Sequence, residues 1–271
     1  MAVIIPSACT IAGMDSCGGA GVIADIKTFT TLGVWGCAAV TAVTAQNCKG
    51  VEGIWMMGPD AVRAQIAKVC EECIPAVFKT GMLGNDLIVS AVAESLPGGA
   101  MLVVDPVMVS TSGVRLLDDD GVRELSESLV PLAGVVTPNI PEAEILAGMS
   151  CIRSIDDIKE AGIRILDLGA GAVLIKGGHT DGVPRDYLIT EDDIVFFDGI
   201  RRPYRIHGSG CCLSAAIAAY VAKGEDAKGA CRKGKEFVSC AIDNAVSSSL
   251  QGTRMINPAS CLGSCCFPEI F

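Results

Sequence analysis

Residues 8–32, ACTIAGMDSCGGAGVIADIKTFTTL, decide how the chain begins to fold. Residues 8–12 are uncharged and mostly apolar, which predicts a buried strand. Residues 18–32 predict a helix, because apolar side chains recur there at helical spacing, at Val22, Ile26 and Phe29. The strand leads into the helix through the glycine-rich stretch 13–21, so the chain opens with a strand–loop–helix unit.

The same alternation continues along the chain. Further apolar strands are expected at 37–44, 76–78, 101–104, 135–137 and 172–175, and helices at 60–70, 85–97, 117–130, 155–168, 213–221 and 226–249. Alternating strands and helices predict a mostly parallel sheet that is covered by helices on both faces. The short runs 185–190, 194–198 and 201–206 predict antiparallel strands at one edge. Without a linker or repeat, residues 1–271 are expected to form one α/β domain.

The composition argues against several classes of protein. Half of the residues are hydrophobic and 19% are charged, with a mean hydropathy of +0.47, so the chain is not disordered. A net charge of −10 lacks the basic footprint of a nucleic-acid-binding protein. The uncharged stretch 28–48 is broken by Gly33, Gly36 and several threonines, so no membrane span is expected. No export signal precedes Lys27, and we expect the 14 cysteines to be reduced, in the cytoplasm.

Glycines, amides or charges follow six of the expected strands. They form the stretches 13–21, 45–47, 79–83, 105–108, 138–142 and 176–179. Ligands of open parallel sheets bind at the carboxyl ends of strands, so we expect one large site along that edge.

A phosphate-binding segment is expected at 207–214, HGSGCCLS, directly before a helix. The chain has neither G-x-x-x-x-G-K-[ST] nor G-x-G-x-x-G, which argues against a P-loop and a Rossmann site. Gly208 and Gly210 allow backbone N–H groups to converge, and the helix N-terminus adds its positive dipole end. The alternative is an ordinary Gly-Ser helix cap.

Seven ordered motifs resemble the hydroxymethylpyrimidine kinase/phosphomethylpyrimidine kinase family, the thiamine-pathway branch of the ribokinase superfamily. They are TIAGMDSCGGAGVIADIKT (10–28), TAVTAQN (41–47), KTGML (79–83), VDPVMV (104–109), VTPNIPEA (136–143), LIKGGH (174–179) and HGSGC (207–211). The resemblance covers residues 9–246 and implies a ribokinase-like three-layer α/β/α sandwich.

The sequence departs from the family pattern at five positions. Small polar residues or threonines are usual in the family where this chain has Met14, Cys17, Ile206, Ser209 and Cys212. The hydroxyl of Ser209 and the glycines of the anion loop remain, so the groups that the chemistry needs are kept.

The requirements of phosphoryl transfer and the family resemblance together suggest which residues bind ATP. The backbone of Gly208, Ser209, Gly210 and Cys211 would hold the transferring phosphoryl group. By resemblance, Lys176 contacts the ATP phosphates, unless it is an ordinary surface lysine. His179 is expected near the nucleotide.

Oxygen-bearing side chains are candidates for Mg²⁺. Asn139 and Glu142 form the N-x-x-E pattern that in the superfamily helps to position this ion, often through water. Asp105 would join the same network or, as an alternative, cap the turn before Pro106.

The pyrimidine pocket is expected around Gln46. Its amide can both donate and accept hydrogen bonds, which matches the edge of an aminopyrimidine. By resemblance, Asp25, Met82, Val107 and the backbone of Gly13 complete the pocket. For Asp25 the alternative is an exposed helical carboxylate.

Cys211 stands where sugar-kinase relatives carry an aspartate base. We expect the amides and dipole of the 208–211 turn to lower the pKa of its thiol. It would then assist deprotonation of an alcohol and spare the monophosphate from charge repulsion. The alternative is that Cys211 only fills space in the turn.

The remaining histidine and cysteines are assigned smaller roles. His207 is expected to shape its loop. The cysteine-rich tail at 256–271 lies outside the family motifs and is expected to be dispensable, so that truncation after Met255 leaves turnover unchanged. A zinc site formed by Cys70, Cys73 and the tail cysteines is the disfavoured alternative.

The sequence therefore predicts an ATP- and Mg²⁺-dependent kinase. Its substrates would be 4-amino-5-hydroxymethyl-2-methylpyrimidine and the corresponding monophosphate, and we expect a homodimer. The alternatives are a pyridoxal/pyridoxine kinase or a catalytically silent ligand-binding regulator. A sugar kinase is disfavoured because Cys211 replaces its catalytic aspartate.

Overall fold

The six predicted apolar strands belong to one nine-stranded sheet with the order β3-β2-β1-β4-β5-β6-β7-β8-β9. The computed structural model describes residues 5–110, 112–177 and 183–262. The strands are β1 (Ser7–Asp15), β2 (Trp35–Asn47), β3 (Gly50–Met56), β4 (Val77–Thr80), β5 (Met101–Val104), β6 (Val135–Val136), β7 (Val173–Ile175), β8 (Arg185–Ile189) and β9 (Ile194–Asp198). Strands β1, β2 and β4–β7 pair in parallel, whereas β3 and β8 run antiparallel to their neighbours.

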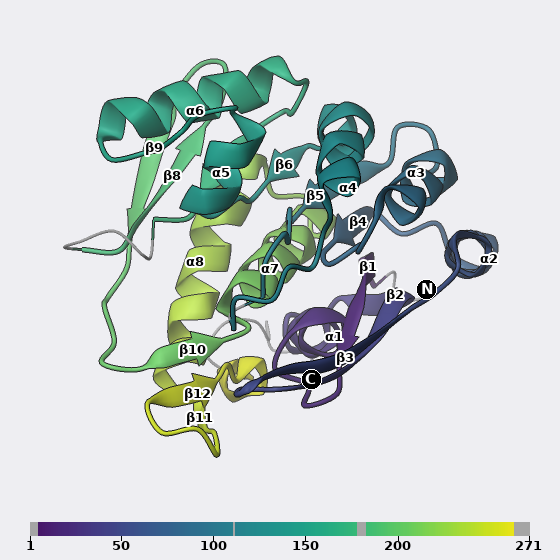
Figure 1. Cartoon of the computed structure of the whole chain (residues 1–271), viewed down its shortest axis with the longest axis horizontal. Helices are drawn as coiled ribbons and strands as arrows, with labels where there is room; N and C mark the ends of the chain where they lie inside the picture. Colours follow the sequence, from purple (N-terminus) through teal and green to yellow (C-terminus); the bar gives the residue numbers. More distant parts are fainter. Residues whose placement is uncertain (1–4, 111, 178–182, 263–271) are drawn as a thin grey trace.

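Helices cover both faces of this sheet (Figure 1). One layer contains α1 (Gly21–Thr31), α7 (Ser209–Ala222) and α8 (Ala227–Asp243). The other contains α2 (Pro59–Glu72), α3 (Asp86–Ser95), α4 (Asp119–Glu124) with the π-helical η1 (Leu125–Leu129), α5 (Ile140–Leu146) and α6 (Ile155–Asp167). Alternate strand residues enter opposite cores: Val103 packs in the α1/α7/α8 layer, and Leu102 and Val104 pack in the other. The predicted three-layer sandwich is confirmed.

The prediction for residues 201–206 is wrong. Instead of joining the antiparallel edge of the main sheet, β10 (Arg205–His207) pairs in parallel with β12 (Thr253–Met255). These strands and β11 (Val246–Ser247) form a separate small sheet, so the helix predicted to reach residue 249 ends at Asp243. The partner of β10 lies far away in the sequence, and a local pattern cannot predict it.

Strand β3 was not predicted, because the two glycines of its sequence GVEGIWM weaken the alternation of polar and apolar residues. The first helix begins at Gly21 rather than at residue 18. The carboxylate of Asp15 holds the intervening loop by accepting from the N–H groups of Cys17 at 2.9 Å and Ala20 at 3.0 Å. In the described part of the chain, no helix is long and apolar enough to span a bilayer.

The segment 256–262 is part of the core. Ile256 and Cys261 are only 6% and 2% exposed, and the Ile256 N–H donates to the His207 carbonyl at 3.1 Å. The short helix η3 (Pro258–Cys261) packs against α1 and α8. The first part of the predicted tail therefore packs in the core, while residues 263–271 lie outside the described part of the chain. That turnover survives truncation after Met255 stays a prediction.

Two truncations test this assignment. Removal of all residues after Met255 deletes Ile256 and Cys261 and exposes the core side chains that they cover. Burial of one large apolar side chain contributes about 1.5–3 kcal/mol to the free energy of unfolding. We expect the melting temperature to fall by several degrees. Truncation after Leu262 removes none of the described core and should leave the melting temperature unchanged. Calorimetry that gave equal melting temperatures for both truncations would contradict this assignment.

Candidate active site

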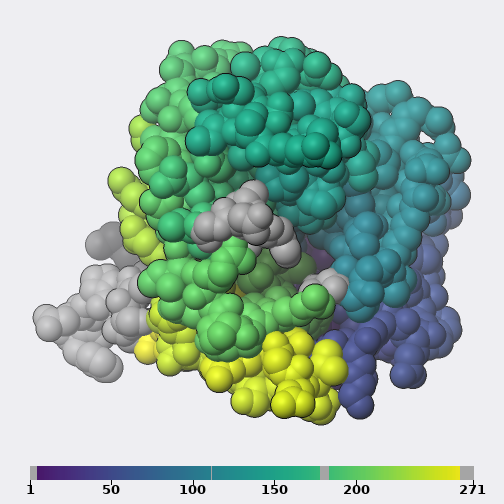
Figure 2. All heavy atoms as spheres, turned by 60° about the vertical axis from the view of Figure 1, so that its left-hand side comes forward, coloured from purple at the N-terminus to yellow at the C-terminus, as the bar shows by residue number. Residues whose placement is uncertain are grey.

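The predicted polar residues meet at one edge of the main sheet. Because β1, β4, β5, β6 and β7 are parallel, their carboxyl ends share this edge. Figure 2 shows a hollow where the teal, green and blue parts of the surface meet, with purple atoms of the N-terminal part at its floor. The residues that follow these strands and the N-terminus of α7 form the candidate site.

The N-terminus of α7 has the features of an anion site. Its cap residue Gly208 has φ +88°, and a Cβ there would lie 1.6 Å from the carbonyl oxygen of Gly19, so only glycine fits. The cap residue has no side chain that could accept hydrogen bonds from the first-turn N–H groups, so these groups can face an anion. An ordinary Gly-Ser cap remains the alternative.

Lys176 lies beside this helix start. Its Nζ donates to Asp105 Oδ1 at 2.9 Å and lies 4.0 Å from Glu142 Oε2. A Cβ built on Gly210 would lie 3.6 Å from the same Nζ, which places the ammonium next to the first turn of α7. Ser214 Oγ, one turn further along the helix, donates to Asp105 Oδ2 at 2.9 Å. The surface-lysine alternative does not hold, because Lys176 is mostly buried within this network.

Burial and charge set the ionisation of the two carboxylates. Burial would raise the pKa of Asp105, but Lys176 and Lys79 outweigh it and hold the pKa below its ordinary value. Burial and the neighbouring Asp105 raise the pKa of Glu142 to about 7, although Lys176 opposes the shift. The pKa of Lys176 is raised, because the two carboxylates outweigh its burial.

The N-x-x-E pattern has a structural role that was not predicted. Asn139 Oδ1 accepts from the Glu142 N–H at 2.9 Å, and Glu142 Oε2 accepts from the Asn139 N–H at 2.8 Å. The two residues thus form a reciprocal capping box at the start of α5. Within the described residues, no three His, Cys, Asp or Glu side chains are arranged to hold a metal ion.

Asp25 is placed more deeply than predicted. It is fully buried, which excludes the exposed-helix alternative, and its Oδ2 accepts from Thr10 Oγ1 at 2.6 Å and from Lys79 Nζ at 2.8 Å. Burial raises the pKa of Asp25 despite Lys79. Oδ1 has no hydrogen-bond partner in the described chain. Its predicted contact with a pyrimidine stays a prediction.

Three of the predicted pocket residues lie close together. The Gly13 N–H donates to the Met82 carbonyl at 3.1 Å, and a Cβ on Gly13 would lie 2.9 Å from Met82 Sδ. Met82 belongs to a small apolar cluster with Ala42 and Leu116, against which Val107 packs. This cluster offers an apolar wall beside the strand ends.

Gln46 lies near the end of β2 and is partly exposed. Its Oε1 accepts from Thr44 Oγ1 at 3.2 Å, and its backbone exchanges hydrogen bonds with Ser16 Oγ. No described group accepts a hydrogen bond from its side-chain NH₂. That donor remains available to a ring acceptor.

The predicted pKa shift of Cys211 has the wrong sign. Burial raises the pKa of its thiol to about 11, and Asp105 and Asp25 add to the rise. Lys79 and the Gly21 N–H lower it but do not compensate. Burial thus outweighs the groups that lower the pKa, and Cys211 is a neutral thiol in the free protein at pH 7.

Asp15 and Lys79, which lie near the ends of β1 and β4 beside the site, were not predicted. His207 Nε2 lies 2.8 Å from Asp15 Oδ2, which confirms His207 as a residue that shapes the loop. Although burial opposes it, this contact lowers the pKa of Asp15. Both missed residues lie inside motifs quoted above, and their position at strand ends was the available signal. His179 lies outside the described residues.

The cysteines do not support the zinc alternative. Cys73 Sγ lies 3.9 Å from Cys37 Sγ, whereas Cys261 contacts Cys240. The C-x-x-C pair and the described part of the tail are therefore in different places.

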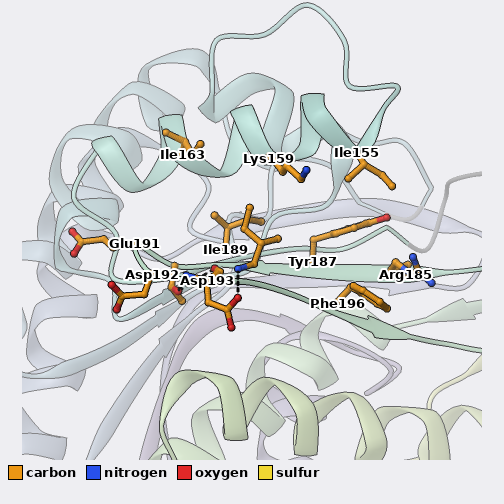
Figure 3. A pocket seen from close by; sticks show the side chains of 12 residues that line it. Ile155, Lys159, Ile163, Arg185, Tyr187, Ile189, Glu191, Asp192, Asp193 and Phe196 are labelled. Carbon is orange, nitrogen blue, oxygen red and sulfur yellow. Dashed lines mark hydrogen bonds between the residues drawn. The ribbon is translucent and has the colours of Figure 1, made fainter.

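A separate open hollow of about 650 Å³ lies between α6 and strands β8 and β9 (Figure 3). Ile155, Lys159 and Ile163 of α6 face Tyr187 and Phe196 of these strands. It contains none of the predicted site residues, so it is distinct from the candidate active site.

Comparisons with known proteins agree with this geometry. The family model for phosphomethylpyrimidine kinase matches residues 15–257. A hydroxymethylpyrimidine/phosphomethylpyrimidine kinase of Bacillus subtilis (strain 168) is 44% identical over 253 residues, which is 89% of this chain and 91% of that protein. The Haemophilus influenzae kinase with the same description is 42% identical over 87% of this chain and 90% of its own length.

Solved structures share the fold. Phosphomethylpyrimidine kinase from Clostridium difficile 630 superposes with a TM-score of 0.78 at 40% identity and covers 88% of this chain and 99% of that one. Pyridoxal kinase from Staphylococcus aureus in complex with ADP superposes with a TM-score of 0.86 at 32% identity, with 95% of both chains covered. The backbone is therefore common to both groups, while sequence identity is higher to the pyrimidine kinase.

Proposed function

Because the chain belongs to the phosphomethylpyrimidine kinase family, we propose that it transfers the γ-phosphoryl group of ATP to 4-amino-5-hydroxymethyl-2-methylpyrimidine. A second transfer to the monophosphate then forms the pyrophosphate that serves thiamine biosynthesis. The observation that carries this proposal is the glycine-capped N-terminus of α7, with Lys176 beside it at the same sheet edge as the Met82 and Val107 wall. A phosphoryl group and an apolar ring would both be held there.

The reaction needs charge stabilisation more than covalent chemistry. The hydroxyl oxygen of the substrate forms a bond to the γ-phosphorus, the bond from that phosphorus to the bridging oxygen breaks, and ADP leaves with the electron pair. The first-turn N–H groups of α7 and the Lys176 ammonium would stabilise the charge on the transferring group. The hydroxyl proton would pass to the thiolate form of Cys211, a titratable residue of the same helix turn.

ATP is the phosphoryl donor, and the S. aureus relative is described as a complex with ADP. We propose Mg²⁺ as its counterion, with Asp105 and Glu142 holding the ion through water molecules. Their donors are oxygens, which suit this ion. The described residues hold no set of three ligands, which agrees with an ion that is bound largely by phosphates and water. The side chain of Asn139 caps α5, so Asn139 would influence the ion only by positioning Glu142. When bound, Mg²⁺ neutralises phosphate charge.

The expected homodimer and cytoplasmic location stay proposals. Trp35 and Trp55, on β2 and β3 at one edge of the main sheet, are 63% and 62% exposed, which is unusual for such large apolar side chains and supports an interface there.

Pyridoxal kinase is the alternative that one observation favours, because its backbone superposes with the higher TM-score. Pyridoxal and the pyrimidine both carry a hydroxymethyl group on an aromatic ring, so the distinction depends on the ring edge.

Replacement of Gln46 tests the ring assignment. Gln46→Leu should leave a ring edge without its hydrogen-bond partner, which costs about 1–3 kcal/mol of binding. We expect the KM for hydroxymethylpyrimidine to rise by about one to two orders of magnitude at nearly constant KM for ATP. Asn47→Leu, one residue further along β2 at an exposed position, is the matched control. A KM within twofold of the wild-type value in Gln46→Leu would show that this side chain does not bind the ring.

A further inference from the structure

A fully buried lysine lies beneath the candidate active site and has no role in the proposal above. Lys79 is 0% exposed on the short strand β4. Strand alternation places it on the same face as Val77, which packs in the layer of α1 and α7. Its Nζ donates to Asp25 Oδ2 at 2.8 Å.

The Lys79–Asp25 ion pair leaves several of its hydrogen-bonding groups without a partner, which is unfavourable if the pair serves stability alone. An ammonium group carries three N–H donors, and Asp25 Oδ2 is the one acceptor that Lys79 reaches among the described residues. The same oxygen also accepts from Thr10 Oγ1, while Oδ1 has no partner. Burying charges with unmet hydrogen bonds is costly, and an apolar pair of similar volume would often be more stable.

The charge of Lys79 acts on the first turn of α7. Among the groups around Cys211, Lys79 has the strongest lowering effect on the pKa of its thiol. Asp105 and Asp25 raise this pKa, Lys176 interacts with the same group, and Cys212 is its buried neighbour on the helix. Helix α7 packs against β4, and Thr28, about one turn after Asp25 on α1, contacts Cys212 Sγ through its Oγ1 at 3.4 Å, so the Lys79–Asp25 pair lies close to the start of α7. Because Lys79 is fully buried, solvent does not screen its charge there.

We infer that Lys79, held in place by Asp25, is a positioning residue that favours negative charge at Cys211 and the first turn of α7. Lys176 supplies a cation from the partly open side of that turn, and Lys79 supplies one from the buried side. This inference deepens the proposed function, because it assumes that Cys211 lies at the reacting centre. Removing the charge should make the Cys211 thiolate harder to form and slow transfer to the alcohol.

Alkylation of the purified full-length protein tests this without any substrate. Iodoacetamide reacts with thiolates, and peptide mass spectrometry can follow Cys211 separately from the other cysteines. Lys79→Gln keeps a donor toward Asp25 but carries no charge, and Lys79→Gln/Asp25→Asn replaces the ion pair with a neutral pair. Lys68→Gln, at an exposed position on α2, is the matched control.

We expect Cys211 in Lys79→Gln to react about fivefold more slowly at pH 9 than in the wild type, with a pH profile displaced upward. The double variant should be slowed by a smaller factor, because it also removes the charge of Asp25, which raises the pKa of the Cys211 thiol. Cys17, which is exposed, should react at an unchanged rate and serves as an internal control. The kcat for the alcohol should fall while the KM for ATP stays within twofold.

Wild-type alkylation rates at Cys211 in a folded Lys79 variant would overturn the inference, even if turnover fell. Loss of the folded state in both variants would assign the pair to stability alone and would also overturn it. The proposed kinase activity is tested separately, by turnover of the wild-type protein.

Discussion

Lys176→Met is expected to lower kcat by about 10²–10³-fold for both pyrimidine substrates. The Lys176 ammonium lies beside the first turn of α7 and within hydrogen-bond distance of Asp105, so it would face the charge that develops on the phosphoryl group. Methionine has a similar length but no charge. A steady-state assay of ADP release at saturating ATP measures the loss.

Two further substitutions separate charge from packing. Lys176→Arg keeps the charge and should retain more activity than Lys176→Met, although its planar head group donates in a different geometry. Lys159→Met, on α6 and distant from the candidate site, should leave kcat within twofold. If Lys176→Met kept more than a third of the wild-type kcat, the ATP-phosphate assignment would be wrong.

Cys211→Ala is expected to slow phosphorylation of the alcohol by about 10²-fold and that of the monophosphate by much less, in line with the usual effect of a general base. The alcohol must lose a proton as it attacks, whereas the monophosphate already carries an anionic oxygen. Cys211→Asp should retain alcohol activity and weaken the monophosphate reaction, because a fixed carboxylate repels that anion.

The raised pKa of Cys211 adds a pH dependence with a definite sign. With a pKa of about 11, the thiolate fraction rises nearly tenfold per pH unit between pH 7 and 9, so the wild-type rate with the alcohol should rise over that range. This rise should be absent in Cys211→Ala and weak for the monophosphate. An equal loss of phosphorylation rate for the alcohol and the monophosphate in Cys211→Ala would show that Cys211 has only a packing role.

The sequence was sufficient for the main features of the fold and the site. The strand predicted at 101–104 is β5, because four apolar residues lie between turn signals. The polar residues after the strands share one edge because parallel pairing brings carboxyl ends together. The clustering of Met82 with Val107 follows from that geometry.

Features that depend on distant partners could not be predicted. The burial of Lys79 requires Asp25, which is 54 positions away in the sequence, and Asp15 meets His207 across 192 positions. The pKa of Cys211 depends on desolvation by the assembled layers, which outweighs the lowering effects of Lys79 and the Gly21 N–H. The Asn139–Glu142 capping box, in contrast, was visible in the sequence but was interpreted only as a metal motif.

This chain is expected to phosphorylate a hydroxymethylpyrimidine and then its monophosphate. A coupled ATP-consumption assay with hydroxymethylpyrimidine, its monophosphate and pyridoxal, run side by side, compares the three substrates. We expect kcat/KM for each pyrimidine to exceed that for pyridoxal by at least about tenfold, equivalent to about 1.4 kcal/mol of transition-state stabilisation. A higher kcat/KM for pyridoxal, or no ATP consumption with either pyrimidine, would contradict the account.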